Sequence, residues 1–196
     1  VGATGSPIAA AATAARDVLL NRFPAQAAAI NTSYENSLKA NGLVPTDPGA
    51  AVGQTAAANI IARRNLDGSF PSNPEIFTGG TAPGEWRPTQ PGFDVPMSAP
   101  WFGNVVPFAL KDTDGLLPEP PPPHLGSGAY AKAYNEVKAL GARANSSRTP
   151  EQTILAYFYS GNFFAMLNGA ARSIAATHLS DIGDTARLFA LATMAG

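Results

Sequence analysis

Apolar residues recur at helical spacing in the first third of the chain. Ser6 followed by Pro7 is typical of a helix start, because serine caps a helix and proline fits its first position. Beyond Pro24 the same spacing returns, and Gly42 is a plausible stop. The inner faces of these two helices are marked by Ile8, Ala12, Ala15 and Leu19, and by Ala27, Ile30, Tyr34 and Leu38. A third helix is predicted from about residue 49 to residue 65, closed by Leu-Asp-Gly at 66–68.

The pattern changes between residues 67 and 125. This segment holds 13 of the 18 prolines, so long helices and central strands are not expected in it. It is nonetheless rich in large apolar residues, in which disordered segments are poor. We therefore expect an ordered arm laid across the helices, closed by the polyproline run at 118–125. We expect its aromatic residues to act as anchors, and its large apolar residues are Phe70, Ile76, Phe77, Trp86, Phe93, Val95, Trp101, Phe102, Val105, Val106 and Phe108.

Helical spacing resumes after the arm. Ser127 is placed to cap a helix that reaches Leu140, with Gly141 as its stop. Its apolar face is Tyr130, Ala133, Tyr134 and Val137. The run Thr149-Pro150-Glu151-Gln152 is the clearest start signal in the chain, because it forms a capping box with proline at the first position. Two apolar helices at 150–160 and 162–177 should follow.

A last helix is predicted to begin near Ser180 or Asp181 and to run to Gly196, with Ile182, Ala186, Phe189 and Ala190 facing inward. No alternating strand pattern of useful length and no internal repeat are visible, so the predicted class is all-α. We expect one domain, made of N-terminal helices at 1–66, the arm at 67–125 and C-terminal helices at 127–196. The uncharged stretch at 152–171 is interrupted by polar residues and Gly161, which favours two buried helices over a membrane span.

Composition narrows the possible functions. Charged residues make up 14% of the chain and the net charge is −1, so no basic field exists to hold a nucleic acid or an anionic membrane. The absence of cysteine excludes disulfides and thiolate catalysis. This suits a periplasmic or secreted bacterial protein, although cytosolic proteins can lack cysteine too. Because the chain begins at Val1 without methionine, we expect that an upstream segment was removed.

Candidate metal and phosphate sites are weak. The run Asp112-Thr113-Asp114-Gly115 begins like a calcium loop but lacks the later ligands, so a turn is favoured. Arg172 and His178, with Asp181 following, have residue types that bind and attack a phosphate. The alternative, which we prefer, is a helix end where the macrodipole favours partial positive charge on His178. A tight oxyanion site needs several convergent donors, and nothing nearby in sequence supplies them.

Several segments, taken in order, resemble the N-terminal helical half of bacterial vanadium-dependent haloperoxidases and their relatives in the type 2 phosphatidic acid phosphatase superfamily. The most specific part is Asn-Glu-Val-Lys at 135–138 followed by Arg-Thr-Pro-Glu-Gln at 148–152. The segments that carry the resemblance are 53–68, 84–93, 99–110, 130–162 and 184–196. The resemblance implies helix bundles and a site that binds vanadate or phosphate through three signatures, all downstream of the helix with which this chain ends. The first is lysine, six residues and then arginine-proline, and the second is proline-serine-glycine-histidine. The third is serine-arginine, five residues, histidine, three residues and then aspartate.

None of those signatures is present here. Arg87-Pro88 has the final pair of the first, but Gly80 stands where a lysine is required. Arg172 and His178 have the spacing of the third, but Ala171 replaces its serine and Asp181 is one residue too close. Proline-serine-glycine-histidine does not occur. We therefore assign no catalytic, cofactor-binding or metal residue to this chain, and expect Arg87 to stack on an aromatic ring or to hold the arm through backbone carbonyls.

The leading hypothesis is that the chain is the non-catalytic scaffold of such an enzyme, incomplete at both ends. Its partner would be the missing catalytic bundle, with the vanadate or phosphate site beyond residue 196. Phosphatase and haloperoxidase are not distinguished, and self-association through uncovered apolar faces is an open possibility. The alternative is a non-enzymatic interaction domain that binds a partner through the aromatic arm. A third, weaker idea is a different helical enzyme that uses Glu151, Asp181 or Asp184 as acid or base.

Overall fold

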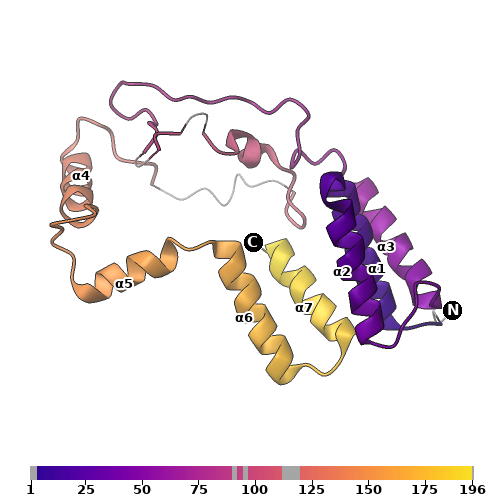
Figure 1. The fold of residues 1–196 in the computed structure, drawn as a ribbon. Coiled ribbons are helices and arrows are strands. Elements are labelled where there is room, and N and C mark those ends of the chain that lie inside the picture. Colours follow the sequence, from indigo (N-terminus) through magenta and orange to yellow (C-terminus); the bar gives the residue numbers. More distant parts are fainter. Residues whose placement is uncertain (1–3, 90–91, 95–96, 112–119, 196) are drawn as a thin grey trace. The chain divides into compact units, whose positions relative to one another are not determined.

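The computed structural model describes residues 4–89, 92–94, 97–111 and 120–195 (Figure 1). These residues contain no strand, so the predicted all-α class is confirmed. The α-helices in the described part are α1 (Pro7–Arg22), α2 (Ala27–Ala40), α3 (Pro48–Arg64), α4 (Gly128–Leu140), α5 (Pro150–Tyr159), α6 (Phe163–His178) and α7 (Ile182–Ala195). Short 3-10 turns occupy Pro24–Gln26 and Pro100–Asn104. The chain forms two compact units, Val1–Phe70 with Ala171–Gly196, and Pro71–Ala170.

Most helix starts were predicted from local signals, and the structure confirms them. The Ser6 hydroxyl accepts from the Ala9 amide at the start of α1, and the Ser127 hydroxyl accepts from Tyr130 at the start of α4. At α5 both halves of the capping box form. The Gln152 amide donates to the Thr149 hydroxyl at 3.2 Å, and the Thr149 amide donates to the Gln152 side chain at 2.9 Å. These contacts satisfy amides that a helix start leaves without an internal partner.

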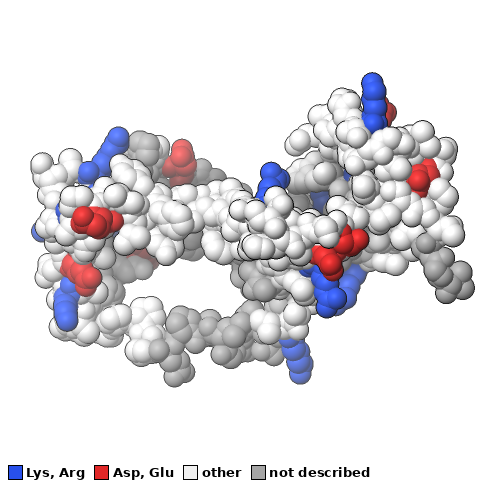
Figure 2. Space-filling view, turned by 90° about the horizontal axis from the view of Figure 1, so that it is seen from below, with Lys and Arg blue, Asp and Glu red and all other residues white. Residues whose placement is uncertain are grey.

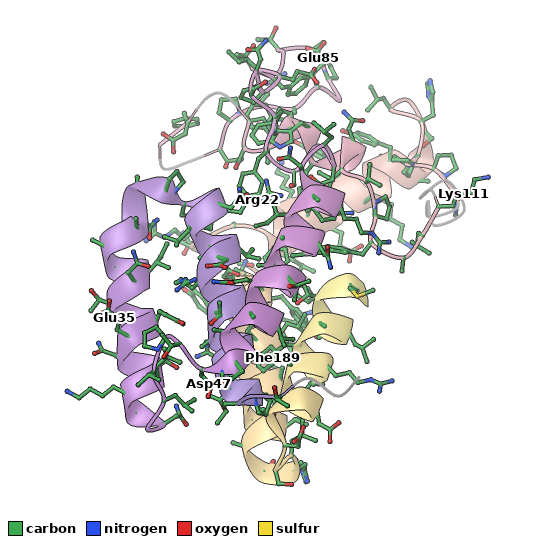
Figure 3. The ribbon with its side chains drawn as sticks, turned by 90° about the vertical axis from the view of Figure 1, so that its right-hand side faces the viewer. Arg22, Glu35, Asp47, Glu85, Lys111 and Phe189 are labelled. Atoms are coloured by element: carbon green, nitrogen blue, oxygen red, sulfur yellow. The ribbon has the colours of Figure 1, made fainter. Side chains whose placement is uncertain are left out.

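In the first unit, α1 and α3 run parallel and are tied at both ends. At one end the Ser6 amide donates to the Asp47 carboxylate at 2.8 Å, and at the other end the Arg22 guanidinium donates to the Arg64 carbonyl at 3.1 Å. Figure 3 shows Arg22 and Asp47 at opposite ends of these helices. Midway, α3 presents Gly53, whose missing Cβ would lie 2.9 Å from the Thr13 Cβ. The two backbones can therefore approach more closely than larger residues allow.

The buried core of this unit is small and lies between α1 and α2. Tyr34 and Leu38 of α2 are buried as predicted, and they cluster with Ala9 of α1. The predicted inner face of α1 is wrong at its C-terminal half, because Ala15 and Leu19 are exposed while Ala9 and Thr13 are fully buried. The helix is rich in alanine on every side, so its periodicity is weak. The close approach of α3 at Gly53 decides which side is buried.

The last helix, α7, also belongs to the first unit and lies against the N-terminal half of α1 (Figure 3). Ile182 and Phe189 are half-buried, as predicted for its inner face. Ala186 is exposed but lines the groove that faces α1 and α3, as predicted, whereas Ala190 is exposed and that part of the prediction is wrong. A narrow apolar groove of about 240 Å³ remains where α7 meets α1 and α3, because the residues that line it are mostly alanine and glycine.

The described part of the arm has no regular helix apart from the turn at Pro100–Asn104. Two backbone hydrogen bonds fold it back on itself, from Met97 to the Phe77 carbonyl and from Gly80 to the Trp86 carbonyl. Trp86, Trp101, Val105 and Phe108 are half-buried. The expectation that the aromatic residues act as anchors is wrong for Phe77, Phe93 and Phe102, which are exposed. Val95 lies outside the described residues, and Phe70 belongs to the first unit, where its ring meets Phe23 edge-on.

The uncharged stretch at 152–171 forms two helices, α5 and α6, separated by Ser160-Gly161-Asn162. Within the described ranges, no helix combines the length and the hydropathy needed to cross a membrane. The predicted burial of these helices is wrong, because most of their large apolar side chains are exposed. Helix periodicity finds the apolar positions but does not identify what covers them.

Candidate functional sites: anion-binding decoys and an apolar surface on α5 and α6

Arg87 holds a loop of the arm. Its guanidinium donates to the Thr81 carbonyl, and the Gly80 amide donates to the Trp86 carbonyl at 3.1 Å. The Glu85 carboxylate accepts from the Ala82 amide at 2.7 Å within the same loop. The prediction that Arg87 holds the arm through a backbone carbonyl is confirmed. A guanidinium used in this way is a structural cross-link between positions 81 and 87.

Arg172 and His178 do not converge. Both lie on α6, and His178 is its last residue, which confirms the helix-end interpretation. Six residues along an α-helix place two side chains about 120° apart around its axis. Both residues are exposed. A phosphate in contact with Arg172 would therefore not be presented to the His178 imidazole by this helix.

The three carboxylates that the sequence offered as a catalytic acid or base, those of Glu151, Asp181 and Asp184, lie at the starts of helices. Asp181 caps α7, because its Oδ1 accepts from the amides of Gly183 and Asp184 at 2.7 and 3.1 Å. Asp184 lies in the first turn of the same helix. Glu151 lies in the first turn of α5, where its own backbone amide and the Thr149 side chain lower the pKa of its carboxyl. A general acid at neutral pH needs a raised pKa, so the shift at Glu151 runs in the wrong direction.

The described residues bring no three His, Asp or Glu side chains together in a way that would hold a metal ion. His124 accepts from the Gly126 amide through its Nδ1 at 3.1 Å, so the ring closes a turn after the polyproline run. The calcium-like run at 112–115 lies outside the described residues.

Sequence analysis missed a buried ion pair at the end of α3. Arg64 Nε lies 2.7 Å from Asp67 Oδ2, and the other Asp67 oxygen accepts from the amide and hydroxyl of Ser69. Burial is the largest single influence on the pKa of Asp67 and raises it, but Ser69 and Arg64 together outweigh burial and hold that pKa below its ordinary value. The spacing of three residues between an arginine and an aspartate was the signal available in the sequence. The pair lies at the C-terminal end of α3.

The most prominent feature of the second unit is an apolar surface on α5 and the first turn of α6. Tyr157 and Tyr159 are 74% and 75% exposed. Ring pairs form along it, with centroids 5.2 Å apart for Phe158 and Tyr159 and 6.0 Å apart for Phe163 and Phe164. We call it the α5–α6 surface, and its members are Ile154, Leu155, Tyr157, Phe158, Tyr159, Phe163 and Phe164.

Charge is sparse along this surface. No Asp, Glu, Lys or Arg occurs between Glu151 and Arg172. Figure 2 shows charged side chains on the visible face scattered singly or in small groups, with wide uncharged areas between them. Large exposed patches of this kind mark interaction sites, because leaving so much apolar area in water is unfavourable.

Searches of known protein families, curated proteins and solved structures find no match to this chain.

Proposed function

We propose that this chain is the helical scaffold of a larger enzyme of the vanadium haloperoxidase or phosphatidic acid phosphatase type, and that the anion site lies on a partner bundle. The observation that carries the proposal is the α5–α6 surface. Seven large apolar side chains gather there within eleven positions, with no charged residue among them. Permanent helix–helix interfaces have this composition, since charged residues are depleted at their centres.

The identity of the partner rests on the resemblance. Its most specific runs, 135–138 and 148–152, lie on α4 and at the junction that leads into α5. The α5–α6 surface follows directly after them in the chain. In this proposal the surface packs on the bundle that binds vanadate or phosphate, and Arg87, Arg172 and His178 keep the local positions described above.

A second candidate function is favoured by a different observation. Exposed rings of the arm, such as Phe77 and Phe102, would suit a non-enzymatic domain that binds a partner through the arm. The two candidates make different predictions about mass. Intact mass spectrometry of the protein purified from its source organism should give a mass well above 20.2 kDa, or a second peptide bearing the anion signatures, if the scaffold proposal holds.

Enzyme assays supply the complementary test. The pure 196-residue chain should show no phosphatase activity and no vanadate-dependent halide oxidation. Turnover by the pure chain that is abolished by His178→Ala would overturn the proposal. His124→Ala is the matched control, because it removes the other histidine of the chain from a different segment.

A further inference from the structure

The arm also contains a pocket that the scaffold proposal does not use. It has a volume of about 460 Å³ and lies entirely within the second unit. It is lined by Phe77, Trp86, Met97 and the segment Ser98–Pro100, together with Glu75. Glu75 is the one ionisable residue among the described residues that line it.

The backbone fixes the two aromatic walls. The Met97 amide donates to the Phe77 carbonyl at 2.7 Å, which joins two of the residues that line the pocket. The Gly80 amide donates to the Trp86 carbonyl at 3.1 Å. The indole of Trp86 packs on Gly79, where an added Cβ would lie 2.6 Å from Cε3. Gly79 also has a φ of +74°, so a larger residue would be disfavoured twice.

The two rings form a corner. Their centroids lie 6.1 Å apart and their planes are inclined at 56°. A cation is attracted to the electron-rich face of an aromatic ring, and tryptophan is the most favourable partner for a cation.

The charge that Glu75 brings to the pocket is opposite to that of a cationic ligand. Glu75 contributes a negative charge to the pocket itself. The neighbouring cation, Arg87, donates to the Thr81 carbonyl, and Glu85 accepts from the Ala82 amide. Residues 75–89 thus carry two carboxylates, Glu75 and Glu85, and one guanidinium, that of Arg87. The guanidinium is held by the Thr81 carbonyl.

We propose that this pocket binds a methylated ammonium group, of the kind found in choline, with Trp86 and Phe77 facing the methyl groups and Glu75 balancing the charge. Such a group has no N–H donors to satisfy. It therefore suits walls of two rings, a thioether and a proline better than a primary ammonium does. The chemistry is shared by free choline and by a phosphocholine lipid headgroup.

Isothermal titration with choline chloride tests the proposal on the full chain. Saturable binding in the millimolar range is expected for a site this open. The neutral isostere 3,3-dimethylbutan-1-ol has the same shape without the charge, and it should bind about tenfold more weakly. Vesicles of phosphatidylcholine, tested by co-sedimentation, distinguish the sources. Capture of vesicles together with choline binding assigns the site to a headgroup, and choline binding alone assigns it to a free ligand.

Substitutions of the lining residues test whether choline binds in this pocket. Trp86→Leu should weaken choline binding about tenfold, and Trp86→Phe should weaken it less because a ring remains. Glu75→Gln should weaken it about threefold, as expected for an exposed charge. Glu136→Gln, on exposed α4 of the same unit, is the matched control and should bind as the unmodified chain does. Circular dichroism confirms that each variant is folded. Absence of saturable binding, equal binding of the neutral isostere, or unchanged binding by both Trp86→Phe and Glu75→Gln would each overturn the proposal.

Discussion

The hydroxyl of Thr13 lies 3.2 Å from the hydroxyl of Tyr34 inside the first unit, and both side chains are buried. This hydrogen bond joins α1 to α2 beside the small apolar cluster of Ala9, Tyr34 and Leu38. The guanidinium of Arg16 lies over the Tyr34 ring, with its central carbon 4.3 Å from the ring centroid. One tyrosine therefore makes both a polar and a cation–π contact with α1. These contacts reinforce a core in which Leu38 is the largest side chain that is fully buried.

Removing either hydroxyl should destabilise the first unit. Tyr34→Phe keeps the ring beneath Arg16 and removes only the hydrogen bond, and Thr13→Val removes the same bond from the other side. Each should lower the free energy of unfolding by about 1 kcal/mol. The double variant should cost less than the two single variants combined, because the second substitution removes a group that has already lost its partner. Urea unfolding followed by circular dichroism measures this, and strict additivity would contradict the contact.

Two helix glycines should respond to alanine in opposite directions. At Gly53 an added Cβ would lie 2.9 Å from the Thr13 Cβ and 3.0 Å from the Ala14 amide nitrogen. Gly53→Ala should therefore destabilise the chain by about 1 to 3 kcal/mol, although alanine is the better helix former. Apart from its chain neighbours and the backbone of its own helix, no described atom lies within 4 Å of the Cβ position of Gly169 in α6. Gly169→Ala should stabilise α6 by up to about 1 kcal/mol. Thermal unfolding of both variants checks the contrast, and a stabilising Gly53→Ala would show that α1 and α3 are not in close contact.

The start of α5 and the buried side of α1 differ in how far the sequence predicts them. Helix starts such as Thr149 were predictable, because a capping box is a contact between residues three positions apart. The buried side of α1 was not predictable, because a helix so rich in alanine presents nearly equivalent faces. The choice is made by Gly53, forty residues further along the chain from Thr13.

The same distinction applies to the candidate sites. The failure of Arg172 and His178 to converge follows from helical geometry and was expected from the sequence. The exposure of Tyr157 and Tyr159 was not expected, because an apolar run predicts burial without naming what covers it. The pocket at Phe77 and Trp86 was also missed. It depends on hydrogen bonds between positions 77 and 97 and between 80 and 86, and no local pattern signals them.

The α4–α5 corner depends on one arginine. The Arg148 guanidinium donates to the carbonyls of Leu140 and Ala142, where α4 has ended, while Thr149 caps α5 directly after it. Arg148→Ala should raise amide hydrogen exchange in the last turn of α4 and the first turn of α5. Arg148→Lys should restore little of the protection from exchange, because an ammonium does not present the planar fork that reaches two carbonyls. Arg143→Ala, an exposed arginine of the same corner, is the control. Exchange that is equal in Arg148→Ala and Arg143→Ala would argue against this role.

Asp67 should make the first unit sensitive to acid. Its folded pKa lies below the ordinary value of 3.8, so ionised Asp67 stabilises the folded state at every pH above that value. The contribution is lost as the pH falls through the lower, folded pKa. The stability difference between the unmodified chain and Asp67→Asn should therefore be constant near neutral pH and should shrink below about pH 4. Urea midpoints measured across this range test the sign, and a difference that grew on acidification would contradict it.

The most direct test of the scaffold proposal is hydrogen–deuterium exchange at residues 154–164, compared between the 196-residue chain alone and the protein purified from its source organism. The proposal predicts strong protection of these residues in the protein from the source, because the catalytic bundle covers the α5–α6 surface there, and rapid exchange at the helix ends of the isolated chain. Identical exchange in the two preparations would contradict it.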